Sequence, residues 1–420
     1  MNDTAIEISA ARPEELDRIL RLVSAAFSLP LEGAREIFFA DPYFDLENKR
    51  VLRVGGEVVS CLTLVDRTCW IGRGTARLAG IAGVVTAPEQ RRRGYAGLLL
   101  NATIQTLRER KFALAALVPA QADYYRRFGW EDAALSQRYL TAPQHLPNYP
   151  EARFVRAATP DDLPAMSRIY DAQSKEKTLH GLRDMKRWNY LYDFVKRRDV
   201  FAGANRVEGY LLYEYRAAPL PQVTPGEKNP VIPPTLRIME LLAETTAARR
   251  GLIGHLANQT PVGCLELEAR IDSLHRSGLL HPAQGNSPSL ASIDIAPAVM
   301  ARIVDFSETV KAVSANWSGL RGQLVLTLTD DTLPGGGVSI LLMGHGGSVT
   351  HLPLPLQDAL ACSDRIAGDV RVWSQVAVGY LSGDDACALG KLSATTARAA
   401  DLAAGLFPRR DPFLPSPDHF

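Results

Sequence analysis

Residues 83–97 read Gly83-Val84-Val85-Thr86-Ala87-Pro88-Glu89-Gln90-Arg91-Arg92-Arg93-Gly94-Tyr95-Ala96-Gly97. The apolar run predicts a strand that enters a basic turn, which then opens a helix over residues 94–110. The first N–H groups of a helix have no internal partner, and the helix dipole favours a negative charge beside them. Gly94 and Ala96 would let the main chain approach a ligand closely. We therefore expect a diphosphate-binding turn, with arginine side chains adding positive charge.

A run of three arginines taken alone is more often a solvated, charged surface. The full context favours the binding turn instead, because an apolar strand, Pro88, the spacing Arg-x-x-Gly-x-Ala and an amphipathic helix occur together. A Walker loop is excluded, since no Gly-Lys-Ser/Thr sequence follows.

Around this turn, residues 1–145 predict alternating strands and helices. Ile6 and Ile8 begin a short strand, and Pro13 opens a helix at a position where its missing N–H costs nothing. Gly55-Gly56 predicts the turn of a hairpin. The expected strands are 51–54, 58–65, 68–71 and 77–86, and the all-apolar run 112–118 has the length of a buried strand.

Two short sequences recur later in the same order. Residues 157–163 repeat the strand end, proline and acidic residues of 10–16, and residues 246–251 are a shortened copy of 86–94. We infer a duplicated unit whose second phosphate-binding turn is closed, because that turn is three residues shorter. A surface loop is expected at 217–234, and a third domain follows. That domain has expected strands at 322–328 and 338–342, helices at 355–361 and 389–406, and a proline-stiffened extended tail.

Composition narrows the class of protein. The chain has 420 residues and a formal net charge of +1, which excludes a strongly basic nucleic-acid coat protein and an acidic tail protein. No run approaches the roughly 20 apolar residues of a membrane helix, and the N-terminus lacks an apolar secretion core. Five cysteines without a CxxC pair fit a reduced, cytoplasmic protein, in which Cys61 and Cys69 would be buried and inert.

A second motif, at residues 124–130, points to a protein family. The sequence Tyr124-Tyr125-Arg126-Arg127-Phe128-Gly129-Trp130 follows the buried strand. Together the two motifs resemble the acyl-CoA loop and the Y-x-x-x-G-F/Y segment of the GNAT (GCN5-related) N-acetyltransferases. With its length, duplicated middle and third domain, the whole chain resembles the Eis (enhanced intracellular survival) acetyltransferases.

The resemblance implies an α/β (α+β) fold of tandem GNAT folds, each a mixed, mostly antiparallel sheet flanked by helices, plus a sterol-carrier-like α+β domain. The implied ranges are 1–148 for an acetyl-CoA-binding catalytic domain, 149–288 for a degenerate GNAT-like domain, and 289–420 for the sterol-carrier-like domain. This last domain would end in a catalytic C-terminal carboxylate. The family also implies a homo-oligomer, a hexamer.

The resemblance also implies site residues. Tyr125 would be the proton donor, with its neighbour Tyr124 as the alternative, and the α-carboxylate of Phe420 would be the general base. Asp418 and His419 are further candidates for substrate binding, although solvent exposure is the default expectation for both. The implied acetyl-CoA contacts are Val84, Val85, Thr86, Arg92, Arg93, Gly94, Tyr95, Ala96, Gly97, Ala120 and Gln121. The sequence Ala120-Gln121-Ala122-Asp123 replaces the family's Ser-acidic-Gly-Gly and indicates altered substrate specificity.

These features predict an acetyl-CoA-dependent N-acetyltransferase for primary amines of polycationic acceptors, such as an aminoglycoside, a polyamine or lysine. Transfer would be direct, in a ternary complex, because no cysteine sits in a nucleophile context and the histidines show no metal-binding spacing. No metal, nucleic acid or membrane span is expected. Two other classes stay open: a non-catalytic acyl-CoA- or lipid-binding module, and an assembly scaffold.

Overall fold

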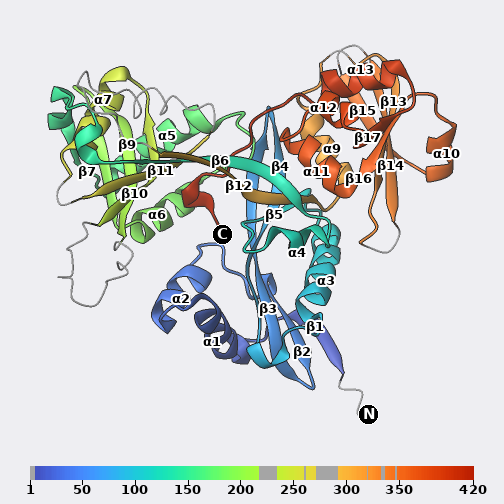
Figure 1. Ribbon diagram of the computed structural model, residues 1–420, viewed down its shortest axis with the longest axis horizontal. Helices are drawn as coiled ribbons and strands as arrows, with labels where there is room; N and C mark the ends of the chain where they lie inside the picture. The colour runs from blue at the N-terminus through green and yellow to red at the C-terminus, as the bar shows by residue number, and fades with distance from the viewer. Residues whose placement is uncertain are drawn as a thin grey trace, which may run out of the picture.

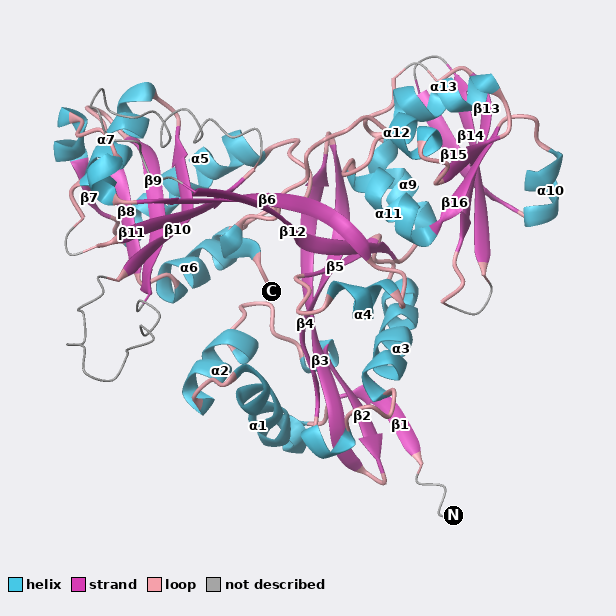
Figure 2. Cartoon of the chain, in the orientation of Figure 1, coloured by secondary structure: helices cyan, strands magenta, loops and turns pink. Residues whose placement is uncertain are grey.

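The computed structural model describes residues 5–216, 234–259, 262–270, 292–318, 320–332, 336–345 and 348–420. Most of the loop expected at 217–234 lies outside these ranges. The described strands form two sheets, one of twelve strands and one of five. Figures 1 and 2 show three lobes, with β6 and β12 running between them and the C-terminus returning to the centre, beside β4 and α6.

The first unit is half of the large sheet. Its strands β1 to β4 pair antiparallel in sequence, and β5 adds parallel to β4. Residues 68–71 are not a separate strand as expected, because β3 pairs with β4 through to the Gly72-Arg73 turn. The strands are β1 Ile6–Ala10, β2 Lys49–Val54, β3 Glu57–Ile71, β4 Gly74–Thr86 and β5 Leu114–Leu117; the helices are α1 Leu16–Phe27, α2 Leu31–Phe39, α3 Tyr95–Glu109 and α4 Ala122–Arg126.

The second unit repeats this topology. Strands β7 to β10 again pair antiparallel in sequence, and β11 adds parallel to β10. A proline-started 3-10 turn leads into the first long helix in both units, at Pro13–Glu15 and Pro160–Asp162. This shared order supports the inferred duplication. The elements are β7 Val155–Ala157, β8 Arg197–Ala202, β9 Val207–Arg216, β10 Thr235–Ala243, β11 Cys264–Ala269, α5 Leu163–Ser174, α6 Met185–Phe194 and α7 Thr246–Ala257.

The two units exchange a strand. β6 (Glu131–Thr141) follows the first unit in the chain but pairs with β11 of the second, whereas β12 (Ser292–Ile303) follows the second unit but pairs with β5 of the first. β6 and β12 also pair with each other, which gives one continuous sheet in the order β5-β12-β6-β11. Each unit therefore depends on main-chain hydrogen bonds from a strand that begins at the other unit.

The third part has its own sheet, in the order β15-β14-β13-β16-β17. The helix expected over 389–406 begins only at 397, because Gly390 adopts a left-handed φ of 66° and residues 392–394 pair with β16. The elements are α9 Phe306–Ser314, β13 Gly322–Thr329, β14 Gly337–His345, β15 Ser348–Leu354, α10 Leu356–Ala361, β16 Arg365–Asp369, α11 Val370–Val378, α12 Gly383–Ala388, β17 Leu392–Ala394 and α13 Ala397–Leu406.

One apolar core joins the third part to the first unit. Leu78 of β4 and Leu114 of β5 belong to the same buried cluster as Trp317 and Trp373. The two indole N–H groups donate to main-chain oxygens, at 2.8 Å for Trp317 and 2.9 Å for Trp373. None of the helices in the described ranges is long and apolar enough to cross a bilayer.

The contact between β4 and α9 leaves no room for a side chain on Gly74. A Cβ atom there would lie 1.9 Å from the main-chain oxygen of Ala312. We expect Gly74→Ala to lower the free energy of unfolding by about 1–3 kcal/mol, as overpacking usually does. Thermal and urea unfolding measure the change.

Gly405→Ala in α13 is the matched control, because no atom lies within 4 Å of the added Cβ. It should leave stability unchanged or raise it slightly. Equal stability of the two variants would contradict the close approach of β4 and α9.

Candidate active site

β4 and β5 pair only briefly before they separate. Their parallel register runs from Leu78↔Leu114 to Gly80↔Ala116 and ends there. β4 continues to Thr86 with β3 on one side, and within the described chain no strand pairs with its other side over residues 81–86. The main-chain groups on that side are available to a ligand that can pair with them like a strand.

A β-bulge changes the direction of β4 just after it separates from β5, at the place that we call the split. Cys61 pairs with Val85 and Thr63 pairs with Ala82, so that two residues of β4 lie opposite one of β3. Gly83 sits in the bulge with a left-handed φ of +56°, a conformation that favours glycine. Three predicted acetyl-CoA contacts, Val84, Val85 and Thr86, therefore lie on the part of β4 that has left β5.

The turn after β4 points unpaired amides outward. A 3-10 turn at Pro88–Gln90 is followed by left-handed Arg92 (φ 63°) and Gly94 (φ 81°), and α3 begins at Tyr95. Among the described residues, no acceptor is bonded to the N–H groups of residues 92–97, and no side chain caps the helix. The side chains of Arg92 and Arg93 are exposed. Uncapped amides, a helix N-terminus and two exposed guanidinium groups together can bind an anion, and we refer to residues 92–97 as the anion-binding turn.

Tyr125 lies on α4, which follows β5 on the other side of the split. Its ring packs edge-on against Tyr124 at 5.4 Å and against Trp130 at 6.4 Å. Burial, and then the neighbouring Tyr124, raise the pKa of Tyr125, so its hydroxyl stays protonated at neutral pH. Burial raises the pKa of Tyr124 as well, and both hydroxyls can therefore donate a proton.

Ala120 and Gln121 form the loop between β5 and α4, and both are exposed. Gln121 is the N-cap residue of α4, yet its side chain makes no capping hydrogen bond. The two residues follow β5 in the chain and directly precede α4, which carries Tyr125.

The C-terminal residue lies against β4 at the last pair before the split. A Cβ atom on Gly80 would lie 2.4 Å from ring carbons of Phe420, so only glycine leaves space for this ring. The tail that leads there is not a frayed, exposed segment, because residues 412–418 are buried. The main-chain N–H of Phe413 donates to the main-chain oxygen of Thr178 at 3.1 Å, which joins the beginning of this buried tail to the second unit.

A buried ion network anchors the end of the tail. Asp418, which we expected to be exposed, is 4% exposed and accepts hydrogen bonds from Arg183 at 2.9 Å and from the Tyr170 hydroxyl at 3.1 Å. Arg183 also pairs with Glu240 at 2.8 Å. Burial alone would raise the pKa of Asp418, but the adjacent charge and hydrogen bonds of Arg183 outweigh burial and lower it to about 2.

His419 is also less exposed than expected and is half-buried. Its Nε2 lies 3.2 Å from the main-chain oxygen of Leu414. Arg187 donates to the oxygen of Pro417 at 2.7 Å, so the last residues before Phe420 are held by side chain and main chain together.

Sequence reasoning missed Gly80, Gly83 and the Asp418–Arg183 pair. The two glycines stand inside an otherwise apolar strand, and this pattern marks a bulge or a close approach, so it could have revealed both. The ion pair left no such pattern, since its two residues are 235 positions apart in the chain.

The second unit lacks the anion-binding turn, as expected from its shorter sequence. Helix α7 has Thr245 as its N-cap residue, and the Thr245 hydroxyl accepts a hydrogen bond from the N–H of Ala248 at 3.1 Å. This capping occupies the helix end that is free in the first unit.

The thiols of Cys61 and Cys69 are not suited to nucleophilic catalysis. Cys61 and Cys69 are buried as expected, and burial raises the pKa of each thiol to about 12. A thiol with so high a pKa is a poor nucleophile at neutral pH.

A cavity of about 620 Å³ opens where the first and second units meet. Three aspartates line it: Asp66 of β3, Asp171 of α5 and Asp184 at the start of α6. Arg67 also lines it and is near enough to help lower the pKa of Asp418, so the cavity adjoins the anchored tail. Its lining residues are Tyr43, Asp66, Arg67, Thr68, Trp70, Asp171, Lys175, Leu182, Arg183 and Asp184.

Comparison with known proteins identifies a domain family for residues 7–133 and a fold for nearly the whole chain. Residues 7–133 match the family model described as Acetyltransferase (GNAT) domain, which confirms the resemblance drawn from the two motifs. The comparison with curated proteins finds no match.

Solved structures match over nearly the whole chain. A GCN5-related N-acetyltransferase from Anabaena variabilis has a TM-score of 0.77 and 20% identity, over 99% of this chain and 100% of that chain. One from Kribbella flavida has a TM-score of 0.76, with the same identity and coverage. Eis1 from Mycobacterium abscessus has a TM-score of 0.69 and 20% identity, also over 99% of this chain and 100% of that chain. At these identities the likeness shows the fold.

The anchored tail gives a first test of this site. Asp418→Asn should release the tail, because removing one partner of a buried ion pair costs about 3–5 kcal/mol. We expect carboxypeptidase to remove Phe420 at least about tenfold faster than from the wild type. Asp411→Asn, which alters an exposed pair with Arg409, is the control and should not change the rate.

The lowered pKa of Asp418 determines whether its contribution to stability rises or falls with pH. Its folded pKa is lowered to about 2, so its stabilising effect is present above the unfolded value of about 3.9 and is lost as pH falls toward 2. The difference in melting temperature between wild type and Asp418→Asn should therefore be constant from pH 5 upward and shrink between pH 4 and 2. A difference that persists at pH 2 would contradict the network.

Proposed function

Residues 7–133 form a GNAT acetyltransferase domain, and from this premise we propose that the protein transfers acetyl from acetyl-CoA to primary amines of polycationic acceptors. One observation carries the proposal: the bulged, unpaired side of β4 leads directly into the uncapped turn of residues 92–97. A non-catalytic scaffold would have no use for unpaired amides at both places.

Acetyl-CoA would bind along this path. Its diphosphate would accept hydrogen bonds from the amides of Arg92, Arg93, Gly94, Tyr95, Ala96 and Gly97, with the two guanidinium groups adding charge. Its pantetheine arm carries amides that can pair with the main chain of Val84, Val85 and Thr86. Ala120 and Gln121 would face the arm from the other side of the split.

The chemistry needs a neutral amine, a polarised thioester and a proton for the leaving thiolate. The amine nitrogen attacks the carbonyl carbon, the C–S bond breaks, and Tyr125 donates its proton to the sulfur. A protonated phenol suits this role, since the raised pKa keeps the proton on Tyr125 until the thiolate forms. The transfer is direct and uses no acyl-enzyme.

The α-carboxylate of Phe420 would take the proton that the amine loses. The reference pKa of such a carboxylate, about 3.3–3.7, is low for a base, and the group could also act through a water molecule. It can also hold a cationic acceptor in place before transfer. The Asp418–Arg183 pair supports this role, because it fixes the chain only two residues before the terminus.

The cavity lined by Asp66, Asp171 and Asp184 is our candidate for the acceptor site. Three cations also line the cavity, but two of them are paired with other carboxylates, Arg67 with Asp41 and Arg183 with Glu240. The aspartates can therefore attract a cationic acceptor, and an aminoglycoside, a polyamine or a lysine side chain each present an ammonium group. The same proposal includes three domains, at 1–148, 149–288 and 289–420, with a sterol-carrier-like third domain. It also includes a hexameric assembly and a cytoplasmic location.

The direct test is release of free thiol from acetyl-CoA over a panel of amines, with native protein and with protein extended by one glycine after Phe420. We expect amine-dependent release that the extension lowers about a hundredfold or more, as loss of a general base does. An added glycine at the N-terminus is the control. Unchanged turnover after C-terminal extension would show that the Phe420 assignment is wrong, and acetyl-CoA binding without any release would favour a non-catalytic binding module.

Substitution separates the two tyrosines. Tyr125→Phe should lower kcat by about 10²–10⁴, the usual contribution of a general acid, and leave the KM for acetyl-CoA nearly unchanged. Tyr124→Phe keeps the edge-on ring contact and should lower kcat less than about tenfold. The opposite ranking would move the proton donor to Tyr124.

A further inference from the structure

The second unit contains its own cavity, where β10 and β11 separate. The parallel register of these strands ends at Ile238↔Leu267, and a cavity of about 250 Å³ opens beyond that pair. It occupies the position that the split between β4 and β5 occupies in the first unit. Because Thr245 caps α7, this position has kept the opening between the strands and lost the anion-binding turn.

Two polar side chains face this cavity without partners. His180 is 8% exposed, and its Nδ1 is buried without a hydrogen-bond partner among the described residues. Arg249, on the first turns of α7, has no ion-pair or hydrogen-bond partner for its guanidinium group within the described chain. A buried polar group without a partner costs free energy, so the buried nitrogen of His180 is more stable with a ligand in place, and the half-buried Arg249 is accessible to an anion.

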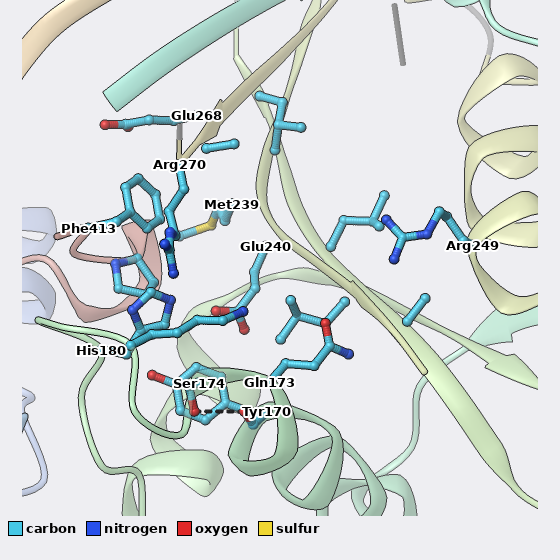
Figure 3. Close-up of a pocket in the computed structure, with 17 residues that line it drawn as sticks. Tyr170, Gln173, Ser174, His180, Met239, Glu240, Arg249, Glu268, Arg270 and Phe413 are labelled. Atoms are coloured by element: carbon cyan, nitrogen blue, oxygen red, sulfur yellow. Dashed lines mark hydrogen bonds between the residues drawn. The ribbon is translucent and has the colours of Figure 1, made fainter. Parts of the chain in front are cut away.

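Figure 3 shows Arg249 on one side of the cavity and His180 with Phe413 on the other. The lining between them is mixed: Glu240 and Gln173 are polar, whereas Leu242 and Leu267 give an apolar strip. Burial lowers the pKa of His180 to about 3, so its imidazole is neutral and can exchange a hydrogen bond with an uncharged group. Arg249 supplies the charge.

Two other charged side chains that line the cavity, Lys177 and Arg270, are also cationic, and the two carboxylates do not cancel the charge of Arg249. Glu240 is already paired with Arg183 at 2.8 Å, and Glu268 lies 3.5 Å from Arg237. The unpaired charge that faces the cavity is therefore positive. Phe413 and Pro415 complete the wall, so the cavity exists only with the tail docked.

We propose that this cavity binds a small amphipathic carboxylate. The carboxylate accepts hydrogen bonds from the guanidinium group of Arg249, the apolar body lies along the leucines, and a hydroxyl or amide group meets His180. The volume is just below the range of about 300–1,000 Å³ typical of small-molecule sites, which suits a compact ligand. The inference does not depend on the transfer reaction.

Calorimetric titration of the full chain tests the proposal. The probes are 3-(4-hydroxyphenyl)propanoate and octanoate, each with its primary amide as the uncharged match. We expect both acids to bind, and each acid to bind about tenfold tighter than its amide, as one charge-assisted hydrogen bond predicts. Arg249→Met should reduce that difference severalfold, since Lys177 and Arg270 also line the cavity.

Arg250→Met is the matched control, because it removes the same charge from the same helix, while Arg250 pairs with Glu151 outside the cavity. It should bind both acids as the wild type does. Arg249 is only half-buried, so its substitution should leave the fold intact, and an unchanged melting temperature checks this. Absence of binding by both acids at millimolar concentration, or equal binding by wild type and Arg249→Met, would overturn the proposal.

Discussion

Two parallel strands that pair and then separate form the constraint on which the site depends. The first part of β4 pairs with β5, and the part beyond it does not. The hydrogen bonds between these two strands therefore stop at Gly80. Beyond that residue, β4 is kept extended by β3 alone and bends at the Gly83 bulge. Unpaired main-chain groups inside a protein are costly unless a ligand or water satisfies them, which links this local loss of pairing to binding.

The exchange of β6 and β12 explains how a sheet with two such splits remains one body. At each split, one strand has no partner on one of its sides. The exchanged strands continue the sheet beyond the splits, because β12 pairs with β5 and β6 pairs with β11. The first unit cannot complete its sheet without a strand that follows the second unit. The second unit therefore supports the first, even though Thr245 caps its helix α7 and it has no anion-binding turn of its own.

The tail couples the far end of the chain to the same place. Chain ends are usually frayed, yet residues 412–418 are buried and Asp418 is held by a charged, hydrogen-bonded network. Such a network is stabilising only when every member has a partner, and here Tyr170 and Tyr210 donate to the two carboxylates that flank Arg183. This docking brings the ring of Phe420 onto Gly80, at the point where β4 and β5 separate.

The sequence alone determined the local features: the proline-started helices, the hairpin at Gly55-Gly56, the uncapped turn before α3 and the shortened second turn. Each depends on residues within about ten positions of one another, where backbone sterics and capping leave few alternatives. Only the tertiary structure decided the exchange of β6 with β12, the burial of Asp418 and the cavity between β10 and β11. The first two depend on contacts between residues more than a hundred positions apart, and the cavity also needs the distant tail residues Phe413 and Pro415 in its wall. Charge and hydrophobicity along the chain do not specify which distant partner will meet which.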